Sequence, residues 1–230
     1  MPRRLRFCPA GFTQHVIQRG NNKQAIFNQN RDIAAYARWL QEAASKYGVE
    51  IHAWVFMTNH VHLLVTPTSD DAISKSIQYL GRLYVEYFNR TYNRTGTLYE
   101  GRFKSHFVQD GAHSLNCQHY IEMNPVRAGM VKDPADYIWS SFRSAAFGNR
   151  ARLWTPNPEY LNLDGSALKR RQVYRSRMAS WADQEFLDEI RHAATKGLTL
   201  GTEKFRKQVE QLRNRSRQSQ RRELDASEDI

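Results

Sequence analysis

Apolar residues follow two different spacings along the chain, and each spacing predicts one kind of element. Over 33–47 and 73–88 they recur every three or four positions, which is typical of an amphipathic helix with one buried face. Elsewhere they alternate with polar residues or form short runs, which predicts strands. The predicted strands are 12–19, 49–57, 60–66 and 103–109. The expected order is therefore strand, helix, strand, strand, helix, strand.

The boundaries of these elements carry their own signals. Asn30 is a candidate N-cap for the first helix and Gly48 ends it, while the acidic pair at 70–71 introduces the second helix. Only residues 58–59 separate the second and third strands, which predicts a hairpin. Strict alternation in the second strand would place one set of side chains on a single face. That set is Val49, Ile51, Ala53, Val55 and Met57.

The order of elements is that of a ferredoxin-like split-βαβ sandwich, an α+β fold with an antiparallel sheet. In this fold we expect both helices on one face of the sheet and the other face free to hold a site. The ferredoxin-like domain is predicted over residues 1–150. Residues 151–230 are predicted to form a basic helical extension, because apolar residues recur with helical spacing over 186–194 and 205–212.

The charge of the chain changes the class of partner to expect. Its 230 residues contain 34 Lys and Arg against 23 Asp and Glu, a net charge of +11, and the isoelectric point is near 9.8. Eight basic and six acidic residues lie in 201–230, so nine of the eleven net charges lie in residues 1–200. The folded body should therefore attract polyanions, with nucleic acid as the leading partner class.

Composition argues against several other classes of protein. A mean hydropathy of −0.71, without a long apolar run, predicts no membrane span, and 12% aromatic residues predict a folded chain rather than a disordered one. The basic residues at the N-terminus are not followed by an apolar stretch, so no secretory signal is predicted. Only two cysteines are present, which suits a reducing cytoplasm.

Two histidines separated by one residue form the sharpest local motif. On a strand His60 and His62 point to the same side, while Val61 between them packs on the other. Two imidazoles on one face can share a metal ion, which would need a further protein ligand and open positions to grip a phosphate. Taken alone, such a motif is more often a hydrogen-bonded pair on a half-polar strand.

A second segment, 120–127, offers the remaining groups. Tyr120 and Asn124 are four residues apart, and hence on one face of a short helix that is predicted to start at Ser114. The helix should end near Asn124, because Pro125 disfavours helical dihedral angles in the residue before it. The alternative interpretation makes Tyr120 a core residue and Asn124 a C-terminal cap.

Other residues with suitable chemistry lack a matching pattern. The remaining histidines are scattered, without the His-Cys-Cys set of a zinc deaminase, and three tyrosines near the second helix are expected in packing. Asp110 is the acid nearest the strand ends and could be a spare ligand, but it is expected in solvent. The sequence has no glycine-rich phosphate loop, which argues against nucleotide-driven chemistry. The scattered residues are His15, His52, His106, His113 and His119, and the tyrosines are Tyr84, Tyr87 and Tyr92.

Together the motifs resemble those of the REP-associated tyrosine transposases, bacterial single-tyrosine members of the His-hydrophobe-His endonuclease superfamily. The pair His60 and His62 is followed by Tyr-Ile-Glu-Met-Asn-Pro-Val-Arg-Ala-Gly, which begins at Tyr120. Further blocks resemble the family in its order, and the resemblance covers about residues 8–147. Those blocks are 15–22, 98–105 and 139–142.

The resemblance implies cleavage and rejoining of single-stranded DNA hairpins at repetitive extragenic palindromes, through a 5′-phosphotyrosine intermediate. Position by position, it makes Tyr120 the nucleophile, His60 and His62 the metal-binding pair, and Asn124 the third ligand. Many relatives in the wider superfamily have glutamine where this chain has Asn124. The resemblance also implies Mg²⁺ or Mn²⁺ as the ion, a monomeric protein, and a bacterial cytoplasmic location with the nucleoid.

Basic residues beside these motifs are candidate phosphate contacts, with solvated surface charges as the alternative. They are Arg19, Lys23, Arg102, Lys104 and Arg127. The arginine-rich stretch 204–222 is either a clamp for a hairpin stem or a solvated terminal helix. Trp139 and Tyr99 are candidate stacking platforms for single-stranded bases, with core packing as the alternative.

Two classes of function stay open at this point. The first is a metal-dependent DNA strand transferase, in which the tyrosine is the nucleophile. The second is a non-catalytic DNA- or RNA-hairpin-binding protein that has kept the fold without the chemistry. A hydrolytic nuclease is a weaker third option. A covalent adduct with a palindromic single strand would separate the first class from the other two.

Overall fold

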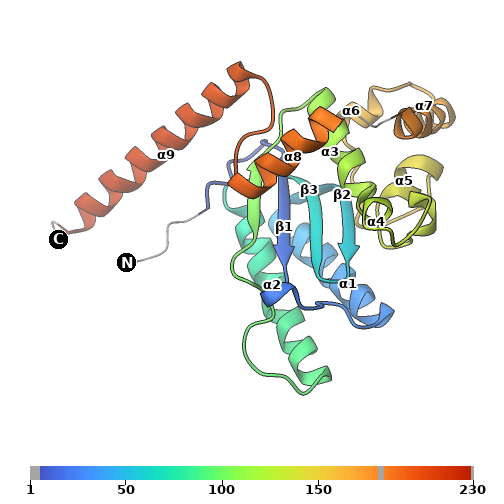
Figure 1. The fold of residues 1–230 in the computed structure, drawn as a ribbon. Coiled ribbons are helices and arrows are strands. Elements are labelled where there is room, and N and C mark those ends of the chain that lie inside the picture. The colour runs from blue at the N-terminus through green and yellow to red at the C-terminus, as the bar shows by residue number, and fades with distance from the viewer. Residues whose placement is uncertain (1–5, 181–183, 229–230) are drawn as a thin grey trace.

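Four antiparallel strands form the sheet at the centre of the fold (Figure 1). The computed structural model describes residues 6–180 and 184–228. Its strands are β1 (Gln14–Arg19), β2 (Val49–Met57), β3 (His60–Pro67) and β4 (Lys104–Phe107). They lie in the order β2-β3-β1-β4, and each neighbouring pair is antiparallel. As predicted, β2 and β3 form a hairpin.

Two long helices, α1 (Asn30–Tyr47) and α2 (Ala72–Thr91), cover one face of this sheet. Their buried side chains form one cluster with Val16 of β1 and with Val61 and Leu63 of β3. The buried stripe of α2 matches the predicted helical spacing. It consists of Ile73, Ile77, Leu80, Tyr84 and Phe88. The strand order and the two helices confirm the ferredoxin-like α+β fold.

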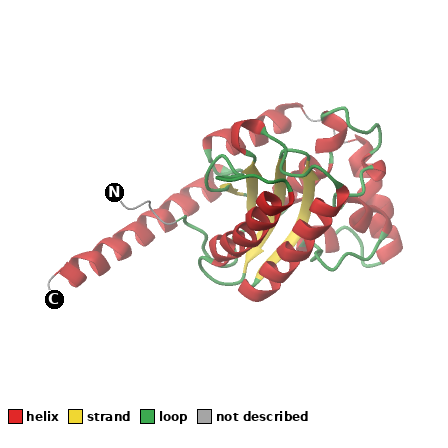
Figure 2. Cartoon of the chain, turned by 90° about the horizontal axis from the view of Figure 1, so that it is seen from below, coloured by secondary structure: helices red, strands yellow, loops and turns green. Residues whose placement is uncertain are grey.

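The opposite face of the sheet is not free, contrary to the prediction. Helices α3 (Ala112–Glu122) and α8 (Gln184–Lys196) lie against it, and Figure 2 shows strands with helices on both sides. Val55 of β2 packs there in one cluster with Ile121 of α3 and Ile190 of α8. Much of this face is apolar, so exposing it would leave a hydrophobic surface in water, and helices from later in the chain cover it instead.

A bulge in β2 changes which of its side chains share a face. The pairing register with β3 shifts between Ile51 and Ala53, so the alternation is interrupted at His52. Ile51 therefore packs in the cluster with α1 and α2, whereas Ala53, Val55 and Met57 pack in the cluster with α3 and α8. The prediction of one shared face for the whole strand is wrong, because strict alternation assumes that no residue is inserted.

The rest of the chain is largely helical. The remaining elements are η1 (Asn21–Lys23), α4 (Asn124–Arg127), η2 (Pro134–Asp136), α5 (Phe142–Phe147), α6 (Pro158–Leu161), α7 (Ala167–Ser180) and α9 (Glu203–Glu228). Helices α8 and α9 correspond to the two predicted amphipathic patterns, whereas α7 was not predicted. Figure 1 shows α9 projecting from the body. No helix in residues 6–180 and 184–228 is long and apolar enough to cross a membrane.

A buried carboxylate joins the extension to the central fold. Glu122, the last residue of α3, accepts hydrogen bonds from the hydroxyl of Tyr174 in α7 at 2.5 Å and from that of Ser141 at 2.6 Å. Burial raises the pKa of Glu122 to about 7, against the effect of these hydrogen bonds. Residues beyond 150 thus pack directly on α3. The boundary at residue 150 stays a prediction.

The start of α1 is held by a buried aspartate. Gln29, not Asn30, is the N-cap, and Asp32 accepts hydrogen bonds from the backbone N–H of Gln29 and of the residue before it, both at 2.9 Å. The same carboxylate accepts bonds from the hydroxyls of Tyr87 at 2.9 Å and Tyr92 at 2.7 Å. Asp32 therefore ties the first turn of α1 to the end of α2.

Replacing Asp32 by Asn should lower the free energy of unfolding at neutral pH by about 1–3 kcal/mol, because an amide cannot accept all four hydrogen bonds. Burial raises the pKa of Asp32, but these bonds outweigh it and hold the pKa below its ordinary value of 3.8. A carboxylate whose pKa is depressed in the folded protein stabilises the fold at pH values above its ordinary pKa. This stabilisation is lost as the pH falls through the pKa of the folded protein.

Urea unfolding of both proteins at neutral pH and in acid measures this effect. The difference in unfolding free energy between wild type and Asp32→Asn should become smaller in acid. The exposed Asp136 provides the control, since Asp136→Asn should change the unfolding free energy by less than about 0.5 kcal/mol. A difference that stays constant into acid would show that the ionised Asp32 does not stabilise the fold.

Candidate active site

One cavity of about 420 Å³ lies where β1, β3 and β4 meet α3 and α8. Seven of the nine predicted site residues line it, from segments far apart in the sequence. They are His60, His62, Tyr120, Asn124, Arg19, Arg102 and Lys104. The other two do not line the cavity: Lys23 is exposed in η1, and Arg127 lies against the ring of Tyr120.

The two histidines of β3 share the face that the alternation predicts. Both line the cavity with their ring centroids 4.9 Å apart, whereas Val61 and Leu63 are buried in the opposite cluster. Nδ1 of His60 donates a hydrogen bond to Oδ1 of Asn59 at 2.6 Å, because a carbonyl oxygen can only accept. Nε2 of His60 is therefore the nitrogen that keeps a lone pair.

A third histidine, outside the pair of His60 and His62, orients His62. Nδ1 of His62 lies 2.7 Å from Nε2 of His15, and Nδ1 of His15 lies 3.3 Å from Nε2 of His106. This chain of buried rings leaves Nε2 of His62 for a ligand. In the sequence His15 is one of several scattered histidines, although it also begins the block 15–22. The signal that could have found it is the alternation of β1, which places His15, Ile17 and Arg19 on one face.

Both motif histidines are uncharged at neutral pH. Burial foremost, with the charge of Arg19 added, lowers the pKa of His60 to about 4. Burial and the neighbouring positive groups lower the pKa of His62 well below its ordinary value. A neutral imidazole keeps the lone pair that a metal ion requires.

Asn124 has the capping role considered for it, whereas its role as a ligand stays a prediction. Its Nδ2 donates to the backbone carbonyls of Tyr120 at 3.0 Å and Ile121 at 3.1 Å, so it caps α3, and the side chain also lines the cavity. Oδ1 is the amide atom left for a ligand. The helix ends at Glu122, near Asn124 as predicted, but its predicted start is wrong, because α3 begins at Ala112 and Ser114 is buried within it. Asn124 begins a further turn, α4, in which Pro125 occupies an early position.

The donor atoms at this cavity fit a divalent cation. Among the residues that the structure describes, no group of three or more His, Cys, Asp or Glu is placed to hold a metal ion. A third protein ligand would therefore be of another type, as the Asn124 amide is. Two imidazole nitrogens and one amide oxygen form a mixed set that leaves positions open for water and a phosphate oxygen.

Tyr120 is a buried phenol beside a cation. Its exposed fraction is 7%, and the guanidinium carbon of Arg127 lies 4.1 Å from the centre of its ring. Burial raises the pKa of Tyr120, and the charge of Arg127 opposes that shift. Nη1 and Nη2 of Arg127 are buried and have no hydrogen-bond partner within the described part of the chain. An anion next to the Tyr120 oxygen would therefore meet unused donors.

The other tyrosines considered lie on the far side of the sheet. Tyr84 is buried in the cluster with α1, and Tyr87 and Tyr92 donate to Asp32, so these hydroxyls have structural partners. The aromatic residues Trp139 and Tyr99 pack against the same cluster. Their role as stacking platforms stays a prediction.

The cavity is also lined by residues that were not among the nine predicted site residues. Glu100 comes from the turn before β4, and Arg191, Ala194 and Thr195 come from α8. The helical spacing in α8 was visible in the sequence. Nothing in that spacing shows that one side of α8 borders this cavity, because this depends on how α8 packs across the sheet.

Residues 10–124 match the model of a protein family described as "Transposase IS200 like". The chain belongs to the IS200-like transposase family. A Haemophilus influenzae protein, named as a REP-associated tyrosine transposase, is 29% identical to this IS200-like transposase over 130 residues, 52% of this chain and 74% of the relative. The REP-associated tyrosine transposase of Escherichia coli K12 is 28% identical over 94 residues, 40% of this chain and 54% of the relative. The resemblance inferred from the motifs is confirmed.

A solved structure supports the same fold for this IS200-like transposase. It is described as a REP-associated tyrosine transposase bound to a REP hairpin. The two structures superpose with a TM-score of 0.53 at 23% sequence identity, over 67% of this chain and 92% of the other. The roles of the individual cavity residues are a separate question.

Proposed function

We propose that this IS200-like transposase is a metal-dependent single-stranded DNA endonuclease and strand transferase that acts at repetitive extragenic palindromic hairpins. The shared cavity carries the proposal, since Tyr120 of α3 lies there with His60 and His62 of β3. A nucleophile beside two neutral imidazoles suits metal-assisted phosphoryl transfer to a tyrosine. The family, and the names of both relatives, agree with this activity.

A divalent ion, Mg²⁺ or Mn²⁺, would be held by Nε2 of His60, Nε2 of His62 and Oδ1 of Asn124. When bound, the ion supplies positive charge to a non-bridging oxygen of the scissile phosphate. Asn59 and His15 keep the two imidazoles oriented through their Nδ1 atoms. Such partners of metal ligands fix the ring orientation and raise the basicity of the ligand.

Tyr120 is the proposed nucleophile. Its phenol oxygen forms a bond to phosphorus, and the bond between phosphorus and the 3′ oxygen breaks. The phenol loses a proton and the departing 3′ oxygen gains one, so the products are a 5′-phosphotyrosine and a free 3′-hydroxyl. Arg127 favours the phenolate, because its cation lies over the ring with buried, unused donors. The covalent link keeps the phosphodiester energy, so rejoining requires no nucleotide.

The substrate is proposed to be held mainly by phosphate contacts. Arg19, Arg102 and Lys104 line the cavity, and the backbone of Lys23 accepts a hydrogen bond from Asn59 beside the histidine motif. Binding should therefore weaken steeply with salt. A hairpin is the proposed form of DNA because the structural relative is described as bound to a REP hairpin. Such a substrate would place the protein with the bacterial nucleoid.

We further propose that one chain is sufficient. Tyr120 reaches the same cavity as His60 and His62 of its own chain, so no group has to come from a second copy. Light scattering of the protein with and without a hairpin should give the mass of one chain. A stable dimer would contradict this proposal.

Incubation with an end-labelled palindromic single strand and Mn²⁺ tests the proposed activity. We expect a protein–DNA adduct that survives denaturing electrophoresis, with the DNA linked to the peptide that contains Tyr120. Binding of the hairpin without any adduct would instead support the non-catalytic hairpin-binding protein. Cleavage without an adduct would support a hydrolytic nuclease.

His15→Phe should lower the affinity for Mn²⁺ about 10- to 100-fold, because it removes the nitrogen that orients His62 while keeping a buried ring of similar size. The apparent Mn²⁺ affinity is measured by titrating the ion in the adduct assay. His106 contacts His15 and not His62, so His106→Phe should lower the Mn²⁺ affinity less. Equal effects of both changes would show that the chain of rings supports the fold rather than the ligand.

A further inference from the structure

We infer that Arg191 of α8 binds a phosphate of the DNA substrate at the catalytic cavity, and that Asp188 positions it there. The inference rests on the proposed function, because the ligand is the DNA backbone beside the scissile phosphate. Arg191 lies beyond residues 10–124, which match the family model. The inference therefore assigns part of the active site to the C-terminal extension.

The placement of α8 brings Arg191 to the reacting groups. Arg191 and Thr195 line the cavity together with His60 and Tyr120. Ile190, the residue before Arg191, is fully buried in the cluster between α8 and the sheet. This apolar contact fixes the rotation of α8 about its axis, so that Arg191 stays at the edge of the cavity.

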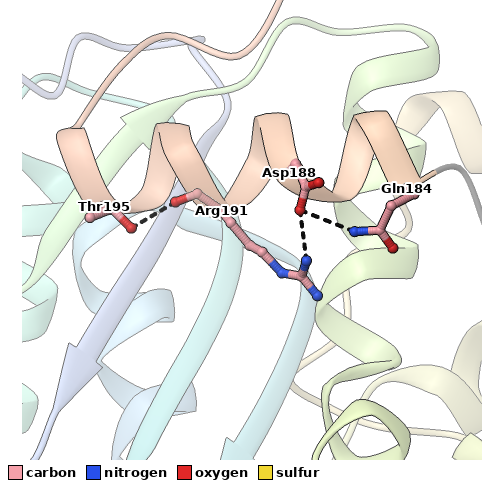
Figure 3. Close-up of polar contacts among 4 residues, drawn as sticks. All are labelled: Gln184, Asp188, Arg191 and Thr195. Atoms are coloured by element: carbon pink, nitrogen blue, oxygen red, sulfur yellow. Dashed lines mark hydrogen bonds and ion pairs between the residues drawn. The ribbon is translucent and has the colours of Figure 1, made fainter.

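A local network holds the Arg191 side chain. Its Nη1 donates to Oδ1 of Asp188 at 2.8 Å, and Nε2 of Gln184 donates to the same oxygen at 3.1 Å. Figure 3 shows the three side chains along one side of α8, with the guanidinium of Arg191 below Asp188. The hydroxyl of Thr195 donates to the backbone carbonyl of Arg191 at 2.8 Å. The guanidinium is thus held by Asp188 from the preceding turn of α8.

The guanidinium keeps donors for a second anion. A guanidinium has five N–H groups, and Asp188 accepts from one nitrogen. The Arg191 side chain is 47% exposed, so a phosphate oxygen can approach the rest of the fork. A planar fork of this kind matches the oxygens of a phosphate.

The chain contains a closely matched control for Arg191. Arg206 of α9 donates to Glu189 of α8 at 2.7 Å, and its side chain is 48% exposed, but it does not line the cavity. Arg191→Gln and Arg206→Gln therefore remove the same charge from two almost equally exposed arginines, each of which is paired with an acidic side chain of α8. Ion pairs this exposed contribute little to stability, so both variants should fold, which thermal unfolding checks.

The rate of adduct formation is measured at saturating labelled hairpin and Mn²⁺ for wild type, Arg191→Gln and Arg206→Gln. We expect Arg191→Gln to lower this rate about 10- to 100-fold, because it removes a charged donor from the transferred phosphate. Arg206→Gln should leave the rate within about twofold of wild type, since a solvent-screened charge outside the cavity affects mainly the encounter with DNA. Arg191→Lys keeps the charge without the fork and should give an intermediate rate.

A change at Asp188 separates positioning from general attraction. Asp188→Asn and Glu189→Gln each raise the net charge by one, and each releases one arginine. If only general attraction matters, both should bind the hairpin more tightly and react as fast as wild type. If Asp188 positions Arg191, Asp188→Asn alone should slow adduct formation, by about 3- to 10-fold, despite its higher positive charge.

The outcomes distinguish this inference from the proposed function. If wild type forms the adduct and Arg191→Gln reacts at the rate of Arg206→Gln, the assignment of Arg191 is wrong and the proposed function stands. If Asp188→Asn matches Glu189→Gln, the positioning role of Asp188 is wrong. If wild type forms no adduct, the proposed function fails and the assignment of Arg191 fails with it.

Discussion

Replacing Tyr120 by Phe should abolish the covalent protein–DNA adduct while leaving hairpin binding nearly unchanged. The change removes only the oxygen that attacks phosphorus and keeps the ring on which Arg127 rests. No other tyrosine hydroxyl can take over the role, because Tyr120 is the one tyrosine among the described residues that lines the cavity. The measurement is adduct formation with labelled hairpin and Mn²⁺, together with a binding titration of the same DNA.

Tyr99→Phe provides the control for this result. The Tyr99 hydroxyl is buried, has no hydrogen-bond partner within residues 6–180 and 184–228, and lies outside the cavity. This variant should form the adduct at the wild-type rate. If Tyr120→Phe still cleaves the DNA as fast as wild type, the tyrosine mechanism is wrong and a water molecule is the nucleophile.

Replacing His60 by Ala should lower metal-dependent cleavage by about three orders of magnitude, since losing a ligand forfeits several kcal/mol of charge stabilisation in the transition state. The salt-sensitive binding of the hairpin should stay largely in place, because it depends on basic residues such as Arg102 and Lys104. The single-turnover cleavage rate and the dissociation constant at two salt concentrations measure these two effects.

The exposed histidine of α8, His192, serves as the control, and His192→Ala should leave both quantities unchanged. His60 is only partly buried and its Nδ1 bonds to the neighbouring Asn59, so its removal should not unfold the sheet. Loss of binding together with cleavage in His60→Ala would show that His60 supports the structure instead of the reaction.

The ferredoxin-like fold was predictable because its signals are local. Spacings of two and of three to four residues marked all four strands and the two helices of the central unit, and the two-residue turn at 58–59 paired β2 with β3. The bulge near His52 was not predictable, since a single inserted residue leaves the apolar composition of the strand unchanged. It moved Ala53 and Val55 to the face that carries the cavity.

The candidate site was predictable only in part. The common face of His60 and His62 follows from the period of a strand, and the link to Tyr120 came from the family resemblance rather than from physical reasoning. The coverage of the second face of the sheet was not predicted, because the helical spacing in α8 predicts an apolar side of the helix but not the surface on which that side packs. Arg191 was missed for the same reason.

By itself, the sequence determined the order of the elements, the two faces of β3 and the basic charge of the body. These properties depend on composition and on the spacing of near neighbours, so they do not require the folded chain. Only the tertiary structure decided which distant side chains meet: His15 behind His62, Arg127 on Tyr120, and Arg191 at the edge of their cavity. The first contact arises because β1 pairs with β3 in the sheet. The other two arise because the apolar face of the sheet has to be covered, and the helices that cover it carry polar side chains with them.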